Sequence, residues 1–131
     1  MIKIAITGNI GTGKSTVSKI IKLLGYKVFD SDNEIKKLLK KEIVINVIAK
    51  KFDDVPTLLN KDGFVDTTKL GNHVFSNKKE LKKLENILHP MIWKNQKKFI
   101  KRNENEKVLF FDIPLLFEKQ LHKNYNFIIY T

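Results

Sequence analysis

A glycine-rich segment near the N-terminus has the residue types and spacing of a phosphate-binding loop. Gly8 to Ser15 read G-N-I-G-T-G-K-S, which fits the pattern G-x-x-x-x-G-K-[ST], and Thr16 follows. Glycines let the backbone come close to a pyrophosphate, so that successive N–H groups form a nest for anions. The lysine supplies a point charge for the β- and γ-phosphates, and the hydroxyl after it offers a ligand to Mg²⁺. We therefore expect ATP and Mg²⁺ to bind here, with Ser15 on the metal and the loop formed by Gly8, Gly11, Thr12, Gly13, Lys14, Ser15 and Thr16.

The segments beside this loop must place it between a strand and a helix. Residues 2–7 are β-branched and apolar up to Gly8, as a buried strand is. Residues 14–24 carry apolar side chains at helical spacing, and Gly25 follows where helices commonly end. Residues 26–29 predict a second short strand. Such a β-loop-α-β unit builds a parallel sheet with a right-handed crossover, so the loop stands in the context that it requires.

The rest of the chain predicts a helical insert followed by two more strands. Residues 33–104 show apolar side chains at helical spacing, whereas residues 108–113 and 126–130 are short apolar runs typical of buried strands. This order of elements predicts an α/β fold of the P-loop NTPase type, similar to nucleoside and nucleotide kinases, with helices flanking a parallel sheet. We expect a single domain over residues 1–131, in which the insert binds the second substrate.

Local signals mark helix starts inside the insert. Asp66 is placed to cap a helix that begins at Thr67, and Asn77 with Glu80 resembles a capping box. Pro90 fits the first turn of a further helix, because the N–H that proline lacks has no partner there. The sequence therefore predicts a new helix beginning at Pro90.

Aspartates follow the predicted strands at the sheet edge where the loop lies, and open α/β sheets bind their ligands at that edge. Asp30 and Asp32 come after the second strand. One of them could accept a proton from a substrate hydroxyl during phosphoryl transfer, or either could cap the following helix. Asp112 ends the third strand, where it could bridge to a metal ion or cap the next turn. The N-K-x-D signature of guanine-binding proteins is absent, which favours a kinase over a GTPase.

The formal net charge of +11 invites a nucleic-acid interpretation. Lys and Arg together number 25, and because Arg102 is the single arginine, 24 of them are lysines. These lysines are spread along the chain in doublets, which indicates solvated helix faces and compositional drift more than one binding patch. A basic nucleic-acid-binding module is therefore the minor alternative, and we expect no nucleic-acid partner.

Cysteine is absent from the chain, which excludes disulfides, thiolate zinc sites and a cysteine nucleophile. The apolar runs fall short of the roughly 20 residues that a membrane helix needs. The N-terminal segment also lacks the features of a signal peptide. We expect a cytoplasmic protein without membrane contact.

Beyond the loop, the chain resembles the dephospho-CoA kinase family over nearly its whole length. D-x-D after the second strand, L-E-x-I-x-H-P and P-L-L-F-E are much more specific than the loop itself. The resemblance implies transfer of the γ-phosphate of ATP to the ribose 3′-hydroxyl of dephospho-CoA, with Mg²⁺, as the last step of coenzyme A synthesis. Another nucleoside or nucleotide kinase is the alternative. The matching segments, in the family's order, are TGNIGTGKSTV (7–17), LGYKVFDSD (24–32), DGFVDTTKL (62–70), VF (74–75), LENILHPMI (84–92) and DIPLLFE (112–118).

Matching positions imply roles for individual residues. Asp32, the second acid of the family's D-x-D, is implied as the base that orients or deprotonates the 3′-hydroxyl, and Lys14 as the second catalytic residue. Asp112 is expected to join Ser15 at the metal. Asn9 and Thr12 replace a glycine and a serine of the family's loop, where the backbone makes the contacts, so we expect little loss. The implied substrate-binding residues are Thr7, Asp30, His89, Pro114, Leu115 and Leu116.

Members of this family are longer than 131 residues, so the resemblance predicts a C-terminally truncated kinase. An arginine-bearing lid normally follows the fourth strand, whereas Arg102 lies in the predicted insert. An arginine commonly stabilises the charge on a transferring phosphoryl group. We therefore expect weak triphosphate binding and poor turnover, in a monomer or weak oligomer.

Overall fold

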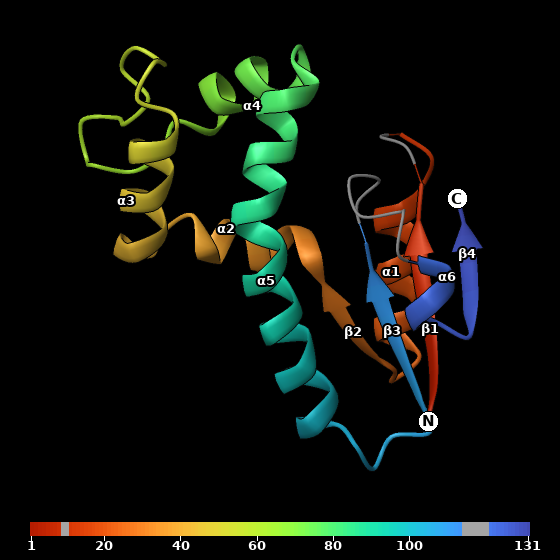
Figure 1. Ribbon diagram of the computed structural model, residues 1–131. Helices are drawn as coiled ribbons and strands as arrows, with labels where there is room; N and C mark the ends of the chain where they lie inside the picture. Colours follow the sequence, from red (N-terminus) through yellow and green to blue (C-terminus); the bar gives the residue numbers. More distant parts are fainter. Residues whose placement is uncertain (9–10, 114–120) are drawn as a thin grey trace. The chain divides into compact units, whose positions relative to one another are not determined.

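Four parallel strands form the sheet of the protein, whose computed structural model describes residues 1–8, 11–113 and 121–131 (Figure 1). The sheet order is β2-β3-β1-β4. In register, Ile6 and Asp30 of the two neighbouring strands lie opposite Asp112 of β3. The carboxyl ends of these strands therefore meet at one edge, as a parallel sheet requires. The strands are β1 (Ile2–Thr7), β2 (Lys27–Asp30), β3 (Val108–Asp112) and β4 (Phe127–Tyr130).

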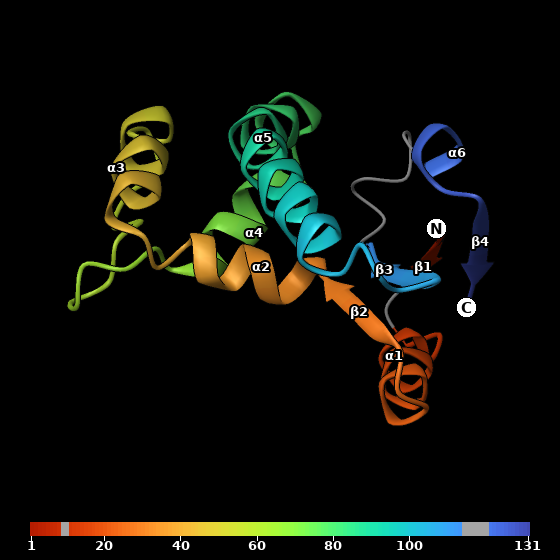
Figure 2. The same cartoon turned by 90° about the horizontal axis from the view of Figure 1, so that it is seen from below.

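One face of this sheet is covered by α1 (Lys14–Leu23), the helix that follows the loop (Figure 2). Its buried Ile21 packs with Ile6 and Phe110 in one core cluster. The helix ends where the sequence predicted, because Gly25 adopts φ +94°, a left-handed conformation that costs glycine little. The apolar stripe of α1 thus fixes the helix start, and with it the loop, over the sheet.

The other face of the sheet carries a cluster of aromatic rings. Phe111 is fully buried, and its ring centroid lies 5.7 Å from that of Phe99 and 5.2 Å from that of Tyr125. Phe99 belongs to α5 (Lys78–Arg102), and Tyr125 follows α6 (Leu121–Asn124). Burial raises the pKa of Tyr125 to about 12, although a hydrogen bond from Gln96 opposes the shift. Because both faces are covered, β3 directs apolar side chains to each of them, Phe110 toward α1 and Phe111 toward the aromatic cluster.

Residues 35–93 form a second compact unit, and residues 1–34 with 94–131 form the first. The second unit is shorter than the predicted insert over 33–104, because the last part of α5 packs Phe99 against the sheet of the first unit. Its other helices are α2 (Ser31–Leu38), whose first residues belong to the first unit, α3 (Glu42–Lys51) and α4 (Thr67–Phe75). Its core includes Val44, Ile48, Phe52, Leu70, Val74 and Leu88.

Two predicted helix starts in the second unit are confirmed. Asp66 caps α4 by accepting a hydrogen bond from the N–H of Lys69 at 3.1 Å. Asn77 accepts from the N–H groups of Lys79 and Glu80, at 3.1 and 3.4 Å, where α5 begins. Short polar side chains that satisfy first-turn N–H groups are thus reliable local signals in this chain.

The helix predicted to begin at Pro90 is wrong, because Pro90 lies inside the single helix α5. A proline in a helix interior removes one hydrogen bond and costs about 3 kcal/mol. Leu88 and Ile92, on either side of it, are buried, so side-chain packing carries the helix through this position. Although α5 runs for 25 residues, neither it nor any other helix in the described part of the chain is long and apolar enough to cross a membrane.

Candidate active site

The loop after β1 enters α1 through left-handed glycines. Gly11 has φ +83°, and Gly13, the N-cap of α1, has φ 89° and ψ 12°. Because the N-cap is a glycine, no side chain caps the first turn of α1. First-turn N–H groups without a side-chain cap favour an anion, and the helix dipole adds to the attraction. The described part of the loop, from Gly11 to the start of α1, therefore has a backbone suited to phosphate binding, whereas Asn9 and Ile10 lie outside the described residues.

Gly8 is required by close contact with the end of β4. A Cβ at this position would lie 2.0 Å from Oγ1 of Thr131 and 2.7 Å from Oγ1 of Thr12. The two threonine hydroxyls are 2.8 Å apart, and that of Thr131 donates to the carbonyl of Thr7 at 3.2 Å. These contacts fasten the start of the loop to β4. The side chain of Thr7 is fully buried in the sheet, so its predicted place in the substrate site stays a prediction.

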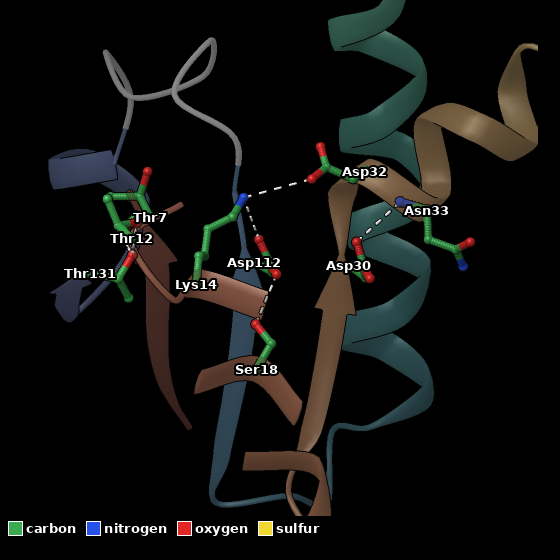
Figure 3. Close-up of polar contacts among 9 residues, drawn as sticks. All are labelled: Thr7, Thr12, Lys14, Ser18, Asp30, Asp32, Asn33, Asp112 and Thr131. Atoms are coloured by element: carbon green, nitrogen blue, oxygen red, sulfur yellow. Dashed lines mark hydrogen bonds and ion pairs between the residues drawn. The ribbon is translucent and has the colours of Figure 1, made fainter. Parts of the chain in front are cut away.

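Lys14 lies between two carboxylates at the carboxyl ends of β2 and β3 (Figure 3). Its Nζ is 2.8 Å from Oδ1 of Asp112 and 3.7 Å from Oδ2 of Asp32. The side chain of Asp112 is only 8% exposed, whereas that of Asp32 is 56% exposed. The lysine thus balances a buried carboxylate that needs a counter-charge, and it stands beside an open carboxylate that a second substrate can reach.

The two candidate acids after β2 have different surroundings. Oδ1 of Asp30 accepts a hydrogen bond from the N–H of Asn33 at 3.1 Å, so Asp30 caps α2. Asp32 sits in the first turn of α2 and faces Lys14 (Figure 3). Of the two roles weighed for this pair, Asp30 takes the capping role. Asp32 is therefore the better placed of the two to meet an acceptor hydroxyl.

The donor atoms near Lys14 fit a hard divalent cation. Ser15 and Thr16 occupy the exposed first turn of α1. Oδ1 of Asp112 is buried and faces the loop lysine. Carboxylate and hydroxyl oxygens are the ligands that Mg²⁺ takes beside phosphates. The residues present thus agree with the metal site predicted at Ser15 and Asp112.

Ser18 is a site residue that the sequence reasoning missed. Its buried hydroxyl donates to Oδ2 of Asp112 at 2.8 Å. Ser18 lies one helical turn after Lys14, so the same face of α1 reaches both oxygens of one carboxylate. Because Ser18 follows Lys14 by four residues, the sequence indicates that both lie on one face of the helix. Nothing local in the sequence identifies Asp112 as their partner. Thr131, which holds the loop, was missed for the same reason.

His89 lies on the part of α5 that belongs to the second unit. Its ring stacks on Trp93, with centroids 5.4 Å apart and planes 27° apart. Burial lowers the pKa of His89, and the nearby Glu85 carboxylate opposes that shift. A neutral, stacked imidazole suits contact with an aromatic ligand or a packing role, so its place in acceptor binding stays a prediction. The other predicted acceptor contacts, Pro114, Leu115 and Leu116, lie outside the described residues.

A second charged cluster occupies the helical unit. Asp54, His73 and Glu80 each present one potential ligand atom, all within 4.8 Å of one another. Nζ of Lys83 lies 2.7 Å from Oε2 of Glu80 and 4.5 Å from the centroid of the Phe52 ring. The ammonium already brings the positive charge that a cation would supply. We therefore assign this cluster as an ion-pair network and not as a metal centre.

Comparison with known proteins gives one consistent result. The sequence model of the dephospho-CoA kinase family matches residues 2–131. Dephospho-CoA kinase from Fusobacterium nucleatum is 42% identical over 120 residues, which cover 92% of this chain and 61% of the relative. That from Helicobacter pylori (strain J99) is 43% identical over 123 residues, covering 93% of this chain and 60% of the relative. This chain thus spans only about three fifths of the length of either relative.

Solved structures show the same likeness in three dimensions. A crystal structure of a Thermus thermophilus protein matches with a TM-score of 0.83 at 32% identity. Dephospho-CoA kinase from Campylobacter jejuni matches with a TM-score of 0.67 at 31% identity. Each match covers 98% of this chain and 64% of the other. These likenesses confirm the predicted α/β fold with a parallel sheet and flanking helices.

Proposed function

The chain belongs to the dephospho-CoA kinase family, and from this premise we propose that it carries the site for ATP-dependent phosphorylation of the ribose 3′-hydroxyl of dephospho-CoA. The observation that carries the proposal is the position of Lys14, whose ammonium lies between the buried Asp112 and the open Asp32. A phosphate bound at Lys14 would have a metal-binding acid on one side and a candidate base on the other.

In this proposal the loop binds the nucleotide through its backbone and Lys14. The N–H groups at the start of α1 and the lysine ammonium hold the β- and γ-phosphate oxygens. When the nucleotide binds, the ammonium of Lys14 would contact phosphate oxygens in place of the carboxylate oxygens of Asp112 and Asp32. Ser15 and Asp112 would hold Mg²⁺, which would neutralise part of the phosphate charge when bound.

In the transfer step, Asp32 accepts the proton of the 3′-hydroxyl. The 3′-hydroxyl oxygen of the acceptor bonds to the γ-phosphorus, and its proton passes to the Asp32 carboxylate. The bond from the γ-phosphorus to the β,γ-bridging oxygen breaks, and its electron pair leaves with ADP. Asp32 can act this way because its side chain is exposed and lies in the first turn of α2, 3.7 Å from Nζ of Lys14.

The partners and the cellular location that we propose follow from this reaction. Dephospho-CoA and ATP are the small-molecule partners, and nucleic acid is not among them. We propose that the protein works in the cytoplasm as a monomer or weak oligomer.

Two measurements on the purified chain test the proposed function. Calorimetry should show ATP binding that Mg²⁺ strengthens and that Lys14→Ala abolishes. A coupled ADP-release assay should show transfer to dephospho-CoA and none to its 3′-deoxy analogue, which lacks the acceptor oxygen. A preference for nucleosides or nucleoside monophosphates would instead support the alternative kinase. ATP binding that Lys14→Ala leaves unchanged would remove the basis of the proposal.

A further inference from the structure

Both oxygens of the Asp112 carboxylate are held by one face of α1. Nζ of Lys14 lies 2.8 Å from Oδ1, and Oγ of Ser18 donates to Oδ2 at 2.8 Å (Figure 3). Ser18 and Asp112 are each 6% exposed. A buried carboxylate oxygen without a donor is costly, so the serine hydroxyl is part of what allows Asp112 to be buried at this edge.

The hydroxyl of Ser18 also has a direction that needs an explanation. Serine inside a helix commonly donates to the carbonyl one turn back in the same helix. Ser18 instead donates to Asp112 at the end of β3. Without such a bond, the carboxylate of an aspartate can rotate over a broad range of its χ2 angle. The bond to Oδ2 selects one orientation of the carboxylate. In that orientation Oδ1 faces the loop and its lysine.

We propose that Ser18 is a positioning residue that acts through Asp112. By holding Oδ2, it keeps Oδ1 directed at the loop, where the Mg²⁺ that accompanies ATP is to be bound. This inference rests on the proposed function, since it concerns the metal-binding acid of the same site. Groups that orient metal ligands from behind typically change metal affinity or activity 10- to 100-fold when removed.

The test compares ATP affinity with and without Mg²⁺ in the whole chain. The ratio of the two affinities measures the contribution of the metal. Both affinities are measured on the same variant, so a general loss of ATP binding cancels in the ratio. Ser18→Ala should lower this ratio about 10-fold. Ser76→Ala is the matched control, because Ser76 also donates a side-chain hydrogen bond but lies in the second unit. It should leave the ratio as it is.

A double-mutant cycle separates positioning from general damage to the fold. If Ser18 acts through Asp112, Ser18→Ala should have no further effect on the ratio in the Asp112→Asn background. An equal loss in both backgrounds would overturn the inference, as would a Ser18→Ala chain with an unchanged ratio. Failure of the proposed function looks different, because the parent chain would then show no strengthening of ATP binding by Mg²⁺, and both proposals would fall.

Discussion

Each unit of the protein brings a lysine to a carboxylate, and the chain builds the two pairs in different ways. Lys83 and Glu80 lie three residues apart on α5, with side chains 35% and 18% exposed. Lys14 and Asp112 come from α1 and β3, at opposite ends of the sequence, and they meet in a buried site. The first pair needs one helix, whereas the second needs the assembled sheet.

This difference separates a structural pair from a functional one. An i,i+3 pair forms on an isolated helix and contributes a few tenths of a kcal/mol. A buried pair loses the hydration of both charges, so it persists only where the fold holds it in good geometry. A protein gains little stability from such a site. A buried pair that lies beside a phosphate-binding loop is therefore better explained by chemistry than by stability.

The largest expected effect is on the rate of phosphoryl transfer, and it should distinguish Asp32 beside Lys14 from Asp54 in the helical cluster. Asp32→Asn should lower the rate of transfer to dephospho-CoA by about 10²- to 10⁴-fold, the usual contribution of a general base, with ATP affinity preserved. Asp54→Asn, an exposed acid of the helical cluster, should leave the rate unchanged. Steady-state kinetics and calorimetry on both variants measure this. Similar rate losses in the two variants would remove the distinction.

The free energy of unfolding should depend much more on Lys14 than on Lys83. Lys14→Met leaves Asp112 buried without its counter-charge and should lower the free energy of unfolding by about 3 kcal/mol. Lys83→Met should cost less than about 1 kcal/mol, because the pair joins neighbouring turns of one helix and the Lys83 side chain is 35% exposed. Urea unfolding followed by circular dichroism gives both values. A cost for Lys83→Met as large as that for Lys14→Met would contradict the contrast drawn between the pairs.

Two glycines extend the comparison to the backbone. Gly8→Ala should destabilise the protein by about 1–3 kcal/mol, because the new methyl overlaps Thr131 and Thr12. Gly71→Ala, within α4, brings its methyl no closer than 3.5 Å to Phe75 and should stabilise by about 0.5–1 kcal/mol. Thermal unfolding of both variants tests the signs. Thr131→Gly should relieve part of the Gly8→Ala cost, since the closest clash is with the Thr131 hydroxyl.

The smallest expected effect is a pH dependence in the second unit. Burial lowers the pKa of His89 in the folded chain below its ordinary 6.5. As pH falls below that value, the unfolded chain takes up a proton that the folded chain resists, so stability falls until the folded pKa is passed. His89→Gln should flatten this part of the stability profile, measured as urea midpoints from about pH 8 to pH 5. A steeper profile in the variant would contradict the assigned direction.

Local patterns predicted most of the fold. The bounds of β1 and the start of α1 follow from apolar runs and glycines, and the caps at Asp66 and Asn77 from side-chain chemistry. The error at Pro90 has a physical cause, because burial of Leu88 and Ile92 outweighs a local preference. The four-residue α6 was not predicted, since it is too short to show a helical period.

The sequence by itself determined the phosphate loop, because each of its requirements lies within a few neighbouring residues: glycines for the turn, a lysine for charge and a helix to follow. Only the tertiary structure decided what surrounds Lys14. β3 pairs between β1 and β2, and this pairing brings Asp112 to Lys14 and Ser18 and places Asp32 nearby. Pairing between distant strands leaves no local period in the sequence, so the partners of the loop appear only once the sheet is assembled.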